Sequence, residues 1–389
     1  MQTGNKKNIL KTLYINNLYD YLYMKNSKVY FIDFHATPKM NILKKLEYLT
    51  ETAGIYQIDF TKKITAVKIH FGEPGNLSYI RPNYAAVLVK MIKEKQGLPF
   101  LTDANTLYKG RRSNAIDHLQ CAMENGFNPL TLGCNVIIAD GLKGTEYREI
   151  EINQKNVKKA KIATAIADAD ILISLNHFKG HEMTGFGGAL KNLGMGCGSI
   201  GGKHEMHSGS QPFINVEKCT GCEVCVNHCE YDAIHMNAEN IAEIDYRNCT
   251  GCGQCIAVCM YDAPQAQSNA EDLQEKMMEY VLAAINEKPS FHINFIMDVS
   301  PHCDCWHYND VPVVPDIGIM ASFDPVAIDR ASADLINKAP VFQNSIIGKK
   351  DTKGKDYFKT IHPNTDWTLG LNYAEKLGLG KQAYDLVEL

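Results

Sequence analysis

The sequence predicts an α/β protein whose largely parallel sheet is interrupted by a small inserted α+β domain. Short apolar runs alternate with helical patterns over residues 24–211, and the same alternation resumes over residues 269–389. Between these parts, residues 212–268 are dominated by a repeated cysteine pattern. We therefore expect one α/β domain with an insertion, preceded by an extension at residues 1–23, rather than three domains in series.

Five strands and two helices are expected before the insertion. The strands are predicted by the runs "KVYFIDF", "ITAVKIHF", "PFLTD", "NVIIAD" and "ADILISLNH". Thr37 as N-cap and Pro38 at the first helical position predict the start of a helix that contains "KMNILKKLEYL". The run "PNYAAVLVKMIKEKQG" predicts a second helix that closes at Gly97.

After the insertion the α/β pattern returns. The run "EDLQEKMMEYVLAAINEK" predicts a helix with one apolar stripe that packs in the core. That stripe consists of Leu273, Met277, Val281, Leu282 and Ile285. Strands are expected at "FHINFIMDV" and "DIGIMASF", and a last helix is expected to begin at Asp324 as N-cap, with Pro325 behind it.

The composition limits the classes of partner. The chain has 389 residues, 45% of them hydrophobic, and a formal net charge of −4, so it has no basic field with which to hold nucleic acid. No apolar run is long enough for a membrane span, and the N-terminus lacks the apolar core of a secretory signal. We expect a cytoplasmic protein with no membrane partner, whose oligomeric state the sequence leaves open.

The strongest signal is an internal repeat. "CTGCEVCVNHCEYDA" begins at Cys219, and "CTGCGQCIAVCMYDA" begins 30 residues later at Cys249, with nine of fifteen positions identical. Each copy reads C-x-x-C-x-x-C-x-x-x-C, a spacing that wraps three thiolates around one face of an iron–sulfur cubane while the fourth points elsewhere. A pair of zinc sites is the alternative, but zinc usually draws on two C-x-x-C pairs with a longer spacer between them.

This repeat resembles the bacterial two-cluster ferredoxins, in which the fourth cysteine of each run ligates the other cluster. The resemblance implies two [4Fe-4S] clusters. One would take Cys219, Cys222, Cys225 and Cys259, and the other would take Cys229, Cys249, Cys252 and Cys255. Glu230 and Met260 stand where that family usually has proline, so the local turn and the reduction potential are less predictable.

The insert is acidic. Residues 212–268 hold eight acidic and two basic side chains, a charge of −6, so the rest of the chain carries +2 against the total of −4. Such a face could dock a basic redox partner protein, or it could be a solvated surface.

Polar residues follow the predicted strands. His70, Asp103, Asp140 and His177 end or follow four of them, and Cys303 and Cys305 follow a fifth. Because ligands of open parallel sheets bind beyond the carboxyl ends of the strands, these groups are expected to share one crevice. The alternative for Asp103 and Asp140 is a structural role as caps of helices or turns.

A glycine-rich stretch, "HFKGHEMTGFGGALKNLGMGCGSIGGKHEMHSG", begins at His177. Its glycines permit close backbone approach to an anion or a cluster sulfur, or they pack a sharp loop against the insert. Lys179 or Lys191 would supply fixed positive charge, or an amine whose pKa falls on burial. The candidate catalytic residues are His177, Lys179, His181, Lys191, Cys197, Cys303 and Cys305.

The stretch "PHCDCWH" begins at Pro301. A structural disulfide between Cys303 and Cys305 would need a small strained ring, so the pair is expected to contact a third metal or a substrate, or else to be buried and inert. Cys121 and Cys134 lie among apolar neighbours and are expected to be inert core residues.

Five features span most of the chain from about Met24: "VKIHFGEPGN", "FLTDANTLY", "LNHFKGHEMTGFGGALKNLGMGC", the two-cluster insert and "DPVAIDRASADLIN". Together they resemble the iron–sulfur branch of the family catalogued as domain of unknown function 362. The likeness implies a ferredoxin-type insert within an α/β domain and no particular reaction. We expect an iron–sulfur oxidoreductase whose clusters pass electrons to a small-molecule substrate or third metal; the alternative is a non-catalytic electron carrier or metallochaperone that docks a partner enzyme.

Overall fold

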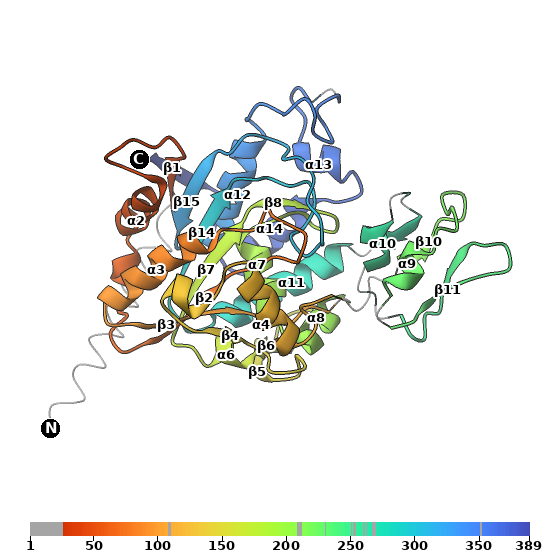
Figure 1. The fold of residues 1–389 in the computed structure, drawn as a ribbon, viewed down its shortest axis with the longest axis horizontal. Helices are drawn as coiled ribbons and strands as arrows, with labels where there is room; N and C mark the ends of the chain where they lie inside the picture. Colours follow the sequence, from red (N-terminus) through yellow and green to blue (C-terminus); the bar gives the residue numbers. More distant parts are fainter. Residues whose placement is uncertain are drawn as a thin grey trace.

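The computed structural model describes residues 26–389 except 108–109, 208–211, 230, 250, 252–253, 260, 262, 267–269 and 351. The expected extension at residues 1–23 lies outside the described residues. The body of the molecule is a mixed α/β structure built around one large sheet (Figure 1). The α/β fold class is therefore confirmed.

Eight strands form the central sheet, in the order β16-β1-β15-β14-β7-β2-β3-β4. Their bounds are β1 Ser27–Asp33, β2 Ile64–Lys68, β3 Leu98–Asp103, β4 Val136–Ile138, β7 Ile171–His177, β14 Ser290–Ile296, β15 Gly318–Ser322 and β16 Tyr384–Glu388. The strands from β14 to β4 are parallel neighbours, β16 is parallel to β1, and β15 is antiparallel to both β1 and β14. The sheet is thus largely parallel, as predicted, with one reversed strand.

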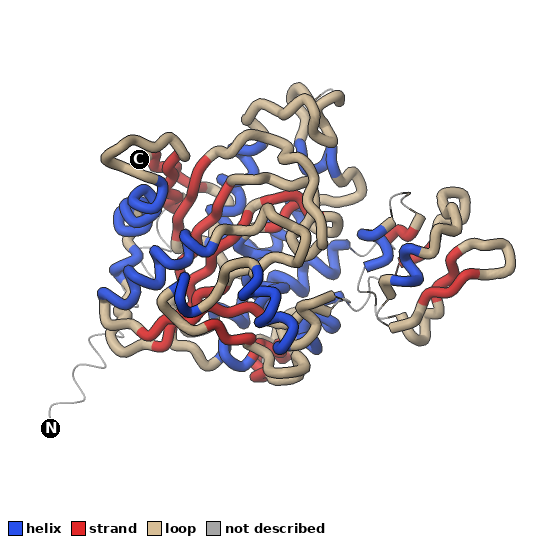
Figure 2. Tube along the Cα trace, in the orientation of Figure 1, coloured by secondary structure: helices blue, strands red, loops and turns tan. Residues whose placement is uncertain are grey.

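Helices cover both faces of this sheet (Figure 2). One face is packed by α2 Ile42–Thr52, α3 Pro82–Glu94 and α4 Ala115–Glu124. The other is packed by α7 Ala189–Cys197, α11 Ala270–Ile285, α12 Pro325–Ile336 and α14 Trp367–Lys376. Neighbouring residues of one strand serve the two faces, as Ala66 and Val67 do in β2, because successive side chains of a strand point to opposite sides.

Smaller elements complete the body. They are the 3₁₀ helix Ile55–Gln57, α5 Pro129–Leu132, α6 Thr164–Ala167, α8 Ile200–His207, α13 Tyr357–Ile361 and two hairpins, β5 Tyr147–Glu151 with β6 Lys159–Ala163 and β8 Lys179–His181 with β9 Gly185–Gly187. Within the described residues no helix is long and apolar enough to cross a membrane.

One predicted helix start is wrong. Thr37 and Met40 close a turn through reciprocal backbone hydrogen bonds, and α2 begins only at Ile42. Asn41 is its N-cap, because its side chain accepts the backbone N–H of Lys44 (3.0 Å). At α12 the prediction is confirmed: Asp324 accepts the N–H groups of Val326 and Ala327, and Pro325 follows it.

The cysteine-rich segment, residues 212–268, for which the name insert is kept, lies to one side of the body in Figure 1. Its elements are β10 Pro212–Ile214, α9 Val224–Asn227, β11 Ile234–Met236, β12 Ala242–Ile244, α10 Gln254–Val258 and β13 Pro264–Ala266. β10 pairs with β13, and β11 pairs with β12, both antiparallel. The chain enters the insert after α8 and returns to the body through α11, so it joins the body through two helices of the same face.

Candidate functional site

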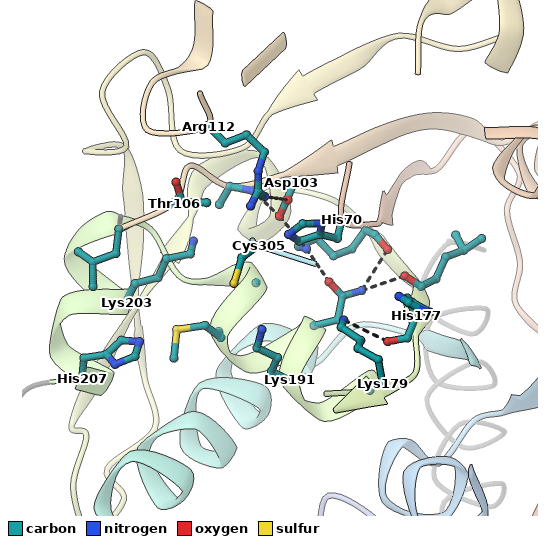
Figure 3. Close-up of a pocket in the computed structure, with 18 residues that line it drawn as sticks. His70, Asp103, Thr106, Arg112, His177, Lys179, Lys191, Lys203, His207 and Cys305 are labelled. Atoms are coloured by element: carbon teal, nitrogen blue, oxygen red, sulfur yellow. Dashed lines mark hydrogen bonds and ion pairs between the residues drawn. The ribbon is translucent and has the colours of Figure 1, made fainter. Parts of the chain in front are cut away.

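A cavity of about 80 Å³ opens at the carboxyl ends of β2, β3 and β7 (Figure 3). This is several times the roughly 10–15 Å³ that one water needs. Its polar lining comprises Lys68, His70, Asp103, Thr106, Arg112, His177, Lys179, Lys191, Asn192, Lys203, His207 and Cys305. The predicted crevice beyond the strand ends is therefore present, since His70, Asp103, His177 and Cys305 all line it.

Asp103, the last residue of β3, anchors one wall. Lys68 Nζ lies 2.8 Å from Asp103 Oδ1 and donates to Asn192 Oδ1 at 2.6 Å. Arg112 donates from Nε to Glu73 Oε2 at 2.6 Å, and its Nη1 lies 3.6 Å from Asp103 Oδ2. Burial alone would raise the pKa of Asp103, but these cations hold it far below its usual value. Asp103 thus organises the cations of the site rather than merely capping a turn.

A second network fixes His177, the last residue of β7. Its Nδ1 lies 2.9 Å from both carboxylate oxygens of Asp304, and its Nε2 lies 2.8 Å from the carbonyl oxygen of Met297. Lys179 Nζ lies 3.2 Å from Asp304 Oδ2. Both ring nitrogens of His177 face acceptors, so its arrangement suits a positioning residue better than a metal ligand.

The "PHCDCWH" stretch is a loop held by Glu182, with Cys303, Asp304 and Trp306 buried and His307 exposed. The Glu182 Oε1 atom accepts from Trp306 Nε1 (2.9 Å) and lies 3.0 Å from His302 Nδ1. The Cys303 backbone N–H also points to it, at 3.4 Å. Burial would raise the pKa of Glu182, but the hydrogen bond from His302 lowers it to about 2. The loop also needs Gly180, because a Cβ there would lie 2.2 Å from the Pro301 carbonyl oxygen.

The two thiols of this loop have different protonation chemistry. A hydrogen bond from Cys305, aided by the Lys191 and His181 charges, holds the pKa of Cys303 well below its usual value despite burial. The same hydrogen bond and burial raise the pKa of Cys305. Lys191 Nζ donates to Cys303 Sγ at 2.9 Å. The arrangement therefore favours a thiolate at Cys303, between the Cys305 thiol and the Lys191 ammonium group, and neither cysteine is in a disulfide.

The idea that the Lys191 amine has a pKa lowered by burial is wrong. Burial does lower it, but the neighbouring Cys303 and Cys305 raise it by more, so the net shift is upward. Lys191 therefore supplies fixed positive charge, which was the other role proposed for it.

The remaining predicted residues lie around the cavity rather than in its wall. His181 lies beside Cys303. Asp140 accepts both Asn105 N–H groups, from the backbone and the side chain, at 2.9 Å. Cys197 is fully buried at the end of α7, and burial raises its pKa to about 11. Cys121 and Cys134 are buried thiols whose pKa values are raised by burial, consistent with their expected inert role.

Three important residues, Lys68, Arg112 and Glu182, carried no clear sequence signal. Lys68 ends an ordinary-looking strand and Arg112 lies in a loop without periodicity, whereas Lys203 belongs to the glycine-rich stretch that the sequence singled out. Glu182 makes its contacts about 120 residues away in sequence, with His302 and Trp306.

In the described part of the chain, no group of three or more His, Cys, Asp or Glu side chains is arranged to hold a metal ion.

The insert has a pocket of its own. Four of its lining residues are Cys219, Cys222, Cys225 and Cys259. The first three come from the first run of the repeat and the fourth from the end of the second. In the other predicted set, Cys229 raises the pKa of Cys249 together with burial, Cys255 is buried, and Cys252 lies outside the described residues.

Comparison with known proteins gives a family but no reaction. The sequence model described as "Domain of unknown function (DUF362)" matches residues 65–334. No curated protein matches the chain.

Two solved structures illustrate the distant likeness. The lactate racemase apoprotein from Thermoanaerobacterium thermosaccharolyticum is 13% identical, with a TM-score of 0.34 and coverage of 69% of this chain and 50% of that one. A Thermotoga maritima protein is 12% identical, with a TM-score of 0.37 and coverage of 78% of this chain and 61% of that one. The chain thus spans less than two thirds of either structure.

Proposed function

The chain belongs to the DUF362 family, and since that family's description states no reaction, we propose from the chain's own residues that it is an iron–sulfur redox protein. In this proposal two [4Fe-4S] clusters in the insert relay electrons to a substrate held in the cavity of the body. The observation that carries the proposal is the grouping of Cys219, Cys222, Cys225 and Cys259 around one pocket.

That grouping is specific because of where its members come from. A site built from one run alone would use Cys229 as the fourth ligand, only four residues after Cys225. Instead the fourth cysteine is Cys259, the last of the second run. Such an exchange between runs is the ligand pattern expected for two-cluster ferredoxins. The shared pocket and the order of these cysteines along the chain, rather than a preformed ligand geometry, support a cluster with four thiolate ligands.

The backbone around these cysteines also suits thiolates. The N–H of Ala242 donates to Cys219 Sγ at 3.4 Å, and the N–H of Ala233 donates to Cys229 Sγ at 3.3 Å. Hydrogen bonds to the sulfurs are one of the means by which a protein sets the potential of a cluster. The two cysteines lie in the two proposed ligand sets, so each set has such a donor.

The body supplies the groups that a reduction needs besides electrons. When bound, the clusters supply electrons one at a time. Cys305, whose pKa is raised, holds a proton at the cavity wall, and Lys191 holds positive charge beside Cys303. A simple electron carrier has no need of a buried cavity with this lining, so the cavity favours the enzyme over the carrier.

The connection between insert and body supports the same assignment. Lys203 and His207, both on α8, line the cavity, and the chain enters the insert shortly after that helix. On the return, α11 packs along α7, the helix that carries Lys191. The insert is thus attached to the body through helices that form or support the cavity wall.

The exchanged cysteine provides the test of the clusters. In Cys259→Ser we expect the dithionite-reduced protein to lose one of two cluster signals in electron paramagnetic resonance. The matched control is Cys121→Ser, which changes a buried thiol outside the insert and should keep both signals. Two intact cluster signals in Cys259→Ser would contradict the proposed ligand set.

A second pair of variants tests the relay. Cys303→Ser is expected to abolish substrate reduction while both cluster signals remain, because Cys303 lies in the body and not in the insert. Loss of a cluster in that variant would instead place Cys303 among the cluster ligands and refute its role at the substrate.

A further inference from the structure

The cavity in the body has an unusually basic lining. Five basic side chains reach it, against the single carboxylate of Asp103. They are Lys68, Arg112, Lys179, Lys191 and Lys203. Lys68 and Arg112 are each 1% exposed, and Lys203 is 7% exposed. Burying cations is costly unless each meets a compensating group, so the partners of these five residues decide what else the cavity must hold.

Three of the five have complete local compensation. Lys68 is paired with Asp103 and Lys179 with Asp304. Lys191 donates to the Cys303 sulfur, whose low pKa favours the thiolate. These contacts hold the three ammonium groups in place around the cavity without any ligand.

The other two are incompletely compensated. The charge of Arg112 is met by Glu73, bound through Nε, and by Asp103, 3.6 Å from Nη1, but its Nη2 atom is buried and has no hydrogen-bond partner among the described residues. Lys203 donates to the carbonyl oxygen of Gly198, and no ion pair in the described chain includes it. Burial lowers its pKa, and the charges of Asp140 and Asp103 offset this only in part.

These two residues face the same space. In Figure 3 the side chains of Arg112, Lys203 and Lys191 reach toward the middle of the cavity from different sides, with the Cys305 sulfur between them. A buried donor without a partner is rare in folded proteins, and beside a cavity a bound water or ligand is its natural partner. A guanidinium group together with an ammonium group matches an oxyanion, because the planar fork of arginine binds two oxygens at once.

We propose that the cavity binds a small organic molecule through a carboxylate or phosphate group, which lies between Arg112 and Lys203. The rest of the molecule extends toward Cys305 and Lys191. That this molecule is the redox substrate rests on the proposed function, whereas its binding does not. An anion there would satisfy Arg112 Nη2 and stabilise the charged form of Lys203.

Two simple probes distinguish the sources of the oxyanion. Malonate and inorganic phosphate are titrated into the cluster-loaded protein, with chloride added to keep the ionic strength constant, and the midpoint of thermal unfolding is measured. A ligand that binds only the folded state raises this midpoint in a saturable way. We expect a saturable rise with at least one probe. Tighter binding of malonate would indicate a carboxylate ligand, and tighter binding of phosphate would indicate a phosphate ligand.

Variants locate the binding. Lys203→Met is expected to weaken the apparent affinity for the tighter-binding probe at least tenfold. The matched control is Lys288→Met: Lys288 is also partly buried, donates only to the backbone carbonyl oxygens of Ile166 and Ala167, and does not line the cavity. In this control the probe should raise the midpoint of thermal unfolding with the same apparent affinity as in the wild type. If Lys203→Met does not fold, Lys203→Gln, which also removes the charge but keeps a polar side chain, decides the question with the same expected loss.

The outcomes separate the two proposals. No saturable response to either probe, or an equal response in wild type and cavity variant, overturns the oxyanion site. Iron and sulfide content, measured on the same samples, reports on the clusters alone. A protein that binds the probes but lacks clusters would keep this inference and refute the proposed function.

Discussion

At the scale of single residues, the site depends on buried charges that are paired with one another. The ion pair between Arg112 and Glu73 is the clearest example, since the arginine side chain is 1% exposed. The pair between Arg148 and Asp168 has similar bonding, with Nη2 to Oδ2 at 2.9 Å, but its arginine is 58% exposed. The two pairs are both arginine–carboxylate ion pairs and differ mainly in burial, so a comparison of their variants measures the effect of burial.

We expect Arg112→Met to lower the free energy of unfolding by about 3–5 kcal/mol, because it leaves Glu73 buried without its partner. Arg148→Met should lower the free energy of unfolding by no more than about 1 kcal/mol, since water screens the exposed pair. Chemical denaturation of both variants measures the difference. Equal costs would show that Glu73 is not held by Arg112 in the folded protein.

The pair between His302 and Glu182 makes stability depend on pH. Burial lowers the pKa of His302, but its hydrogen bond to Glu182 and the charge of that carboxylate raise it by more, so the net shift is upward. A histidine with a raised pKa stabilises the fold below the pKa of the unfolded chain, about 6.5, and this contribution is lost as pH rises through the folded pKa.

His302→Gln should therefore destabilise the protein by about 1–3 kcal/mol at about pH 6 and by less at about pH 9. Denaturant titrations of wild type and variant at the two pH values measure the change. His235→Gln is the control, because the His235 side chain is exposed beside Glu243 and should leave the pH dependence of the body unaltered. If His302→Gln lowered the free energy of unfolding equally at both pH values, His302 would not be charged in the folded protein.

At the scale of elements, the cavity is positioned by helix α7 and its close packing. Asp329 of α12 accepts the N–H groups of Ala189 and Leu190, the first two residues of α7 (2.7 and 2.9 Å). Further along, Gly194 allows α7 to lie against α11, since a Cβ there would be 2.4 Å from the Met277 carbonyl oxygen. These contacts fix the helix that carries Lys191 and Asn192.

Gly194→Ala is expected to lower the free energy of unfolding by about 1–3 kcal/mol, because the backbone of α11 must move away. Gly201→Ala in α8 is the matched control: its added Cβ would have no neighbour closer than 3.7 Å. In Gly201→Ala we expect the free energy of unfolding to be unchanged, or to rise by up to about 1 kcal/mol because alanine has a higher helix propensity than glycine. Thermal unfolding of the two variants measures this, and a tolerated Gly194→Ala would refute the close packing of α7 on α11.

The sequence predicts these elements better than it predicts the contacts among them. Apolar patterns located seven of the eight strands of the sheet, all except β16, and the long helix α11. The rule for parallel sheets placed His70, Asp103, His177 and Cys305 in one crevice, but Asp140 and Cys303, which were expected there too, do not line it. Strand direction has no local signal, so the reversal of β15 was not predicted. Nor was the pairing of β16 with β1, which lies more than 350 residues away.

Individual site residues were missed for the same reason. Arg112 and Glu182 have no distinctive local sequence, and their roles come from contacts with Glu73, His302 and Trp306 that only the folded chain creates. The helix start at Thr37 was wrong because a Thr-Pro signal was outweighed by the side-chain cap at Asn41. Local signals thus locate elements, whereas pairing in space determines the site.

At the scale of the whole molecule, charge and chemistry are divided between two parts. The insert carries eight acidic and two basic residues and the cysteine repeat. The body carries the cavity with five basic side chains. In the proposed function electrons enter through the insert and are used in the cavity, and an acidic insert is suited to a basic donor protein. That partner and the cytoplasmic location remain predictions.

The most direct test of the central claim is the content of iron, acid-labile sulfide and other metals per chain, measured on anaerobically purified wild type and on Cys303→Ser/Cys305→Ser. Two [4Fe-4S] clusters predict about eight irons and about eight sulfides in both proteins. Extra metal that disappears in the double variant would make "PHCDCWH" a third metal site. Zinc in place of iron, or iron without sulfide, would contradict the iron–sulfur proposal.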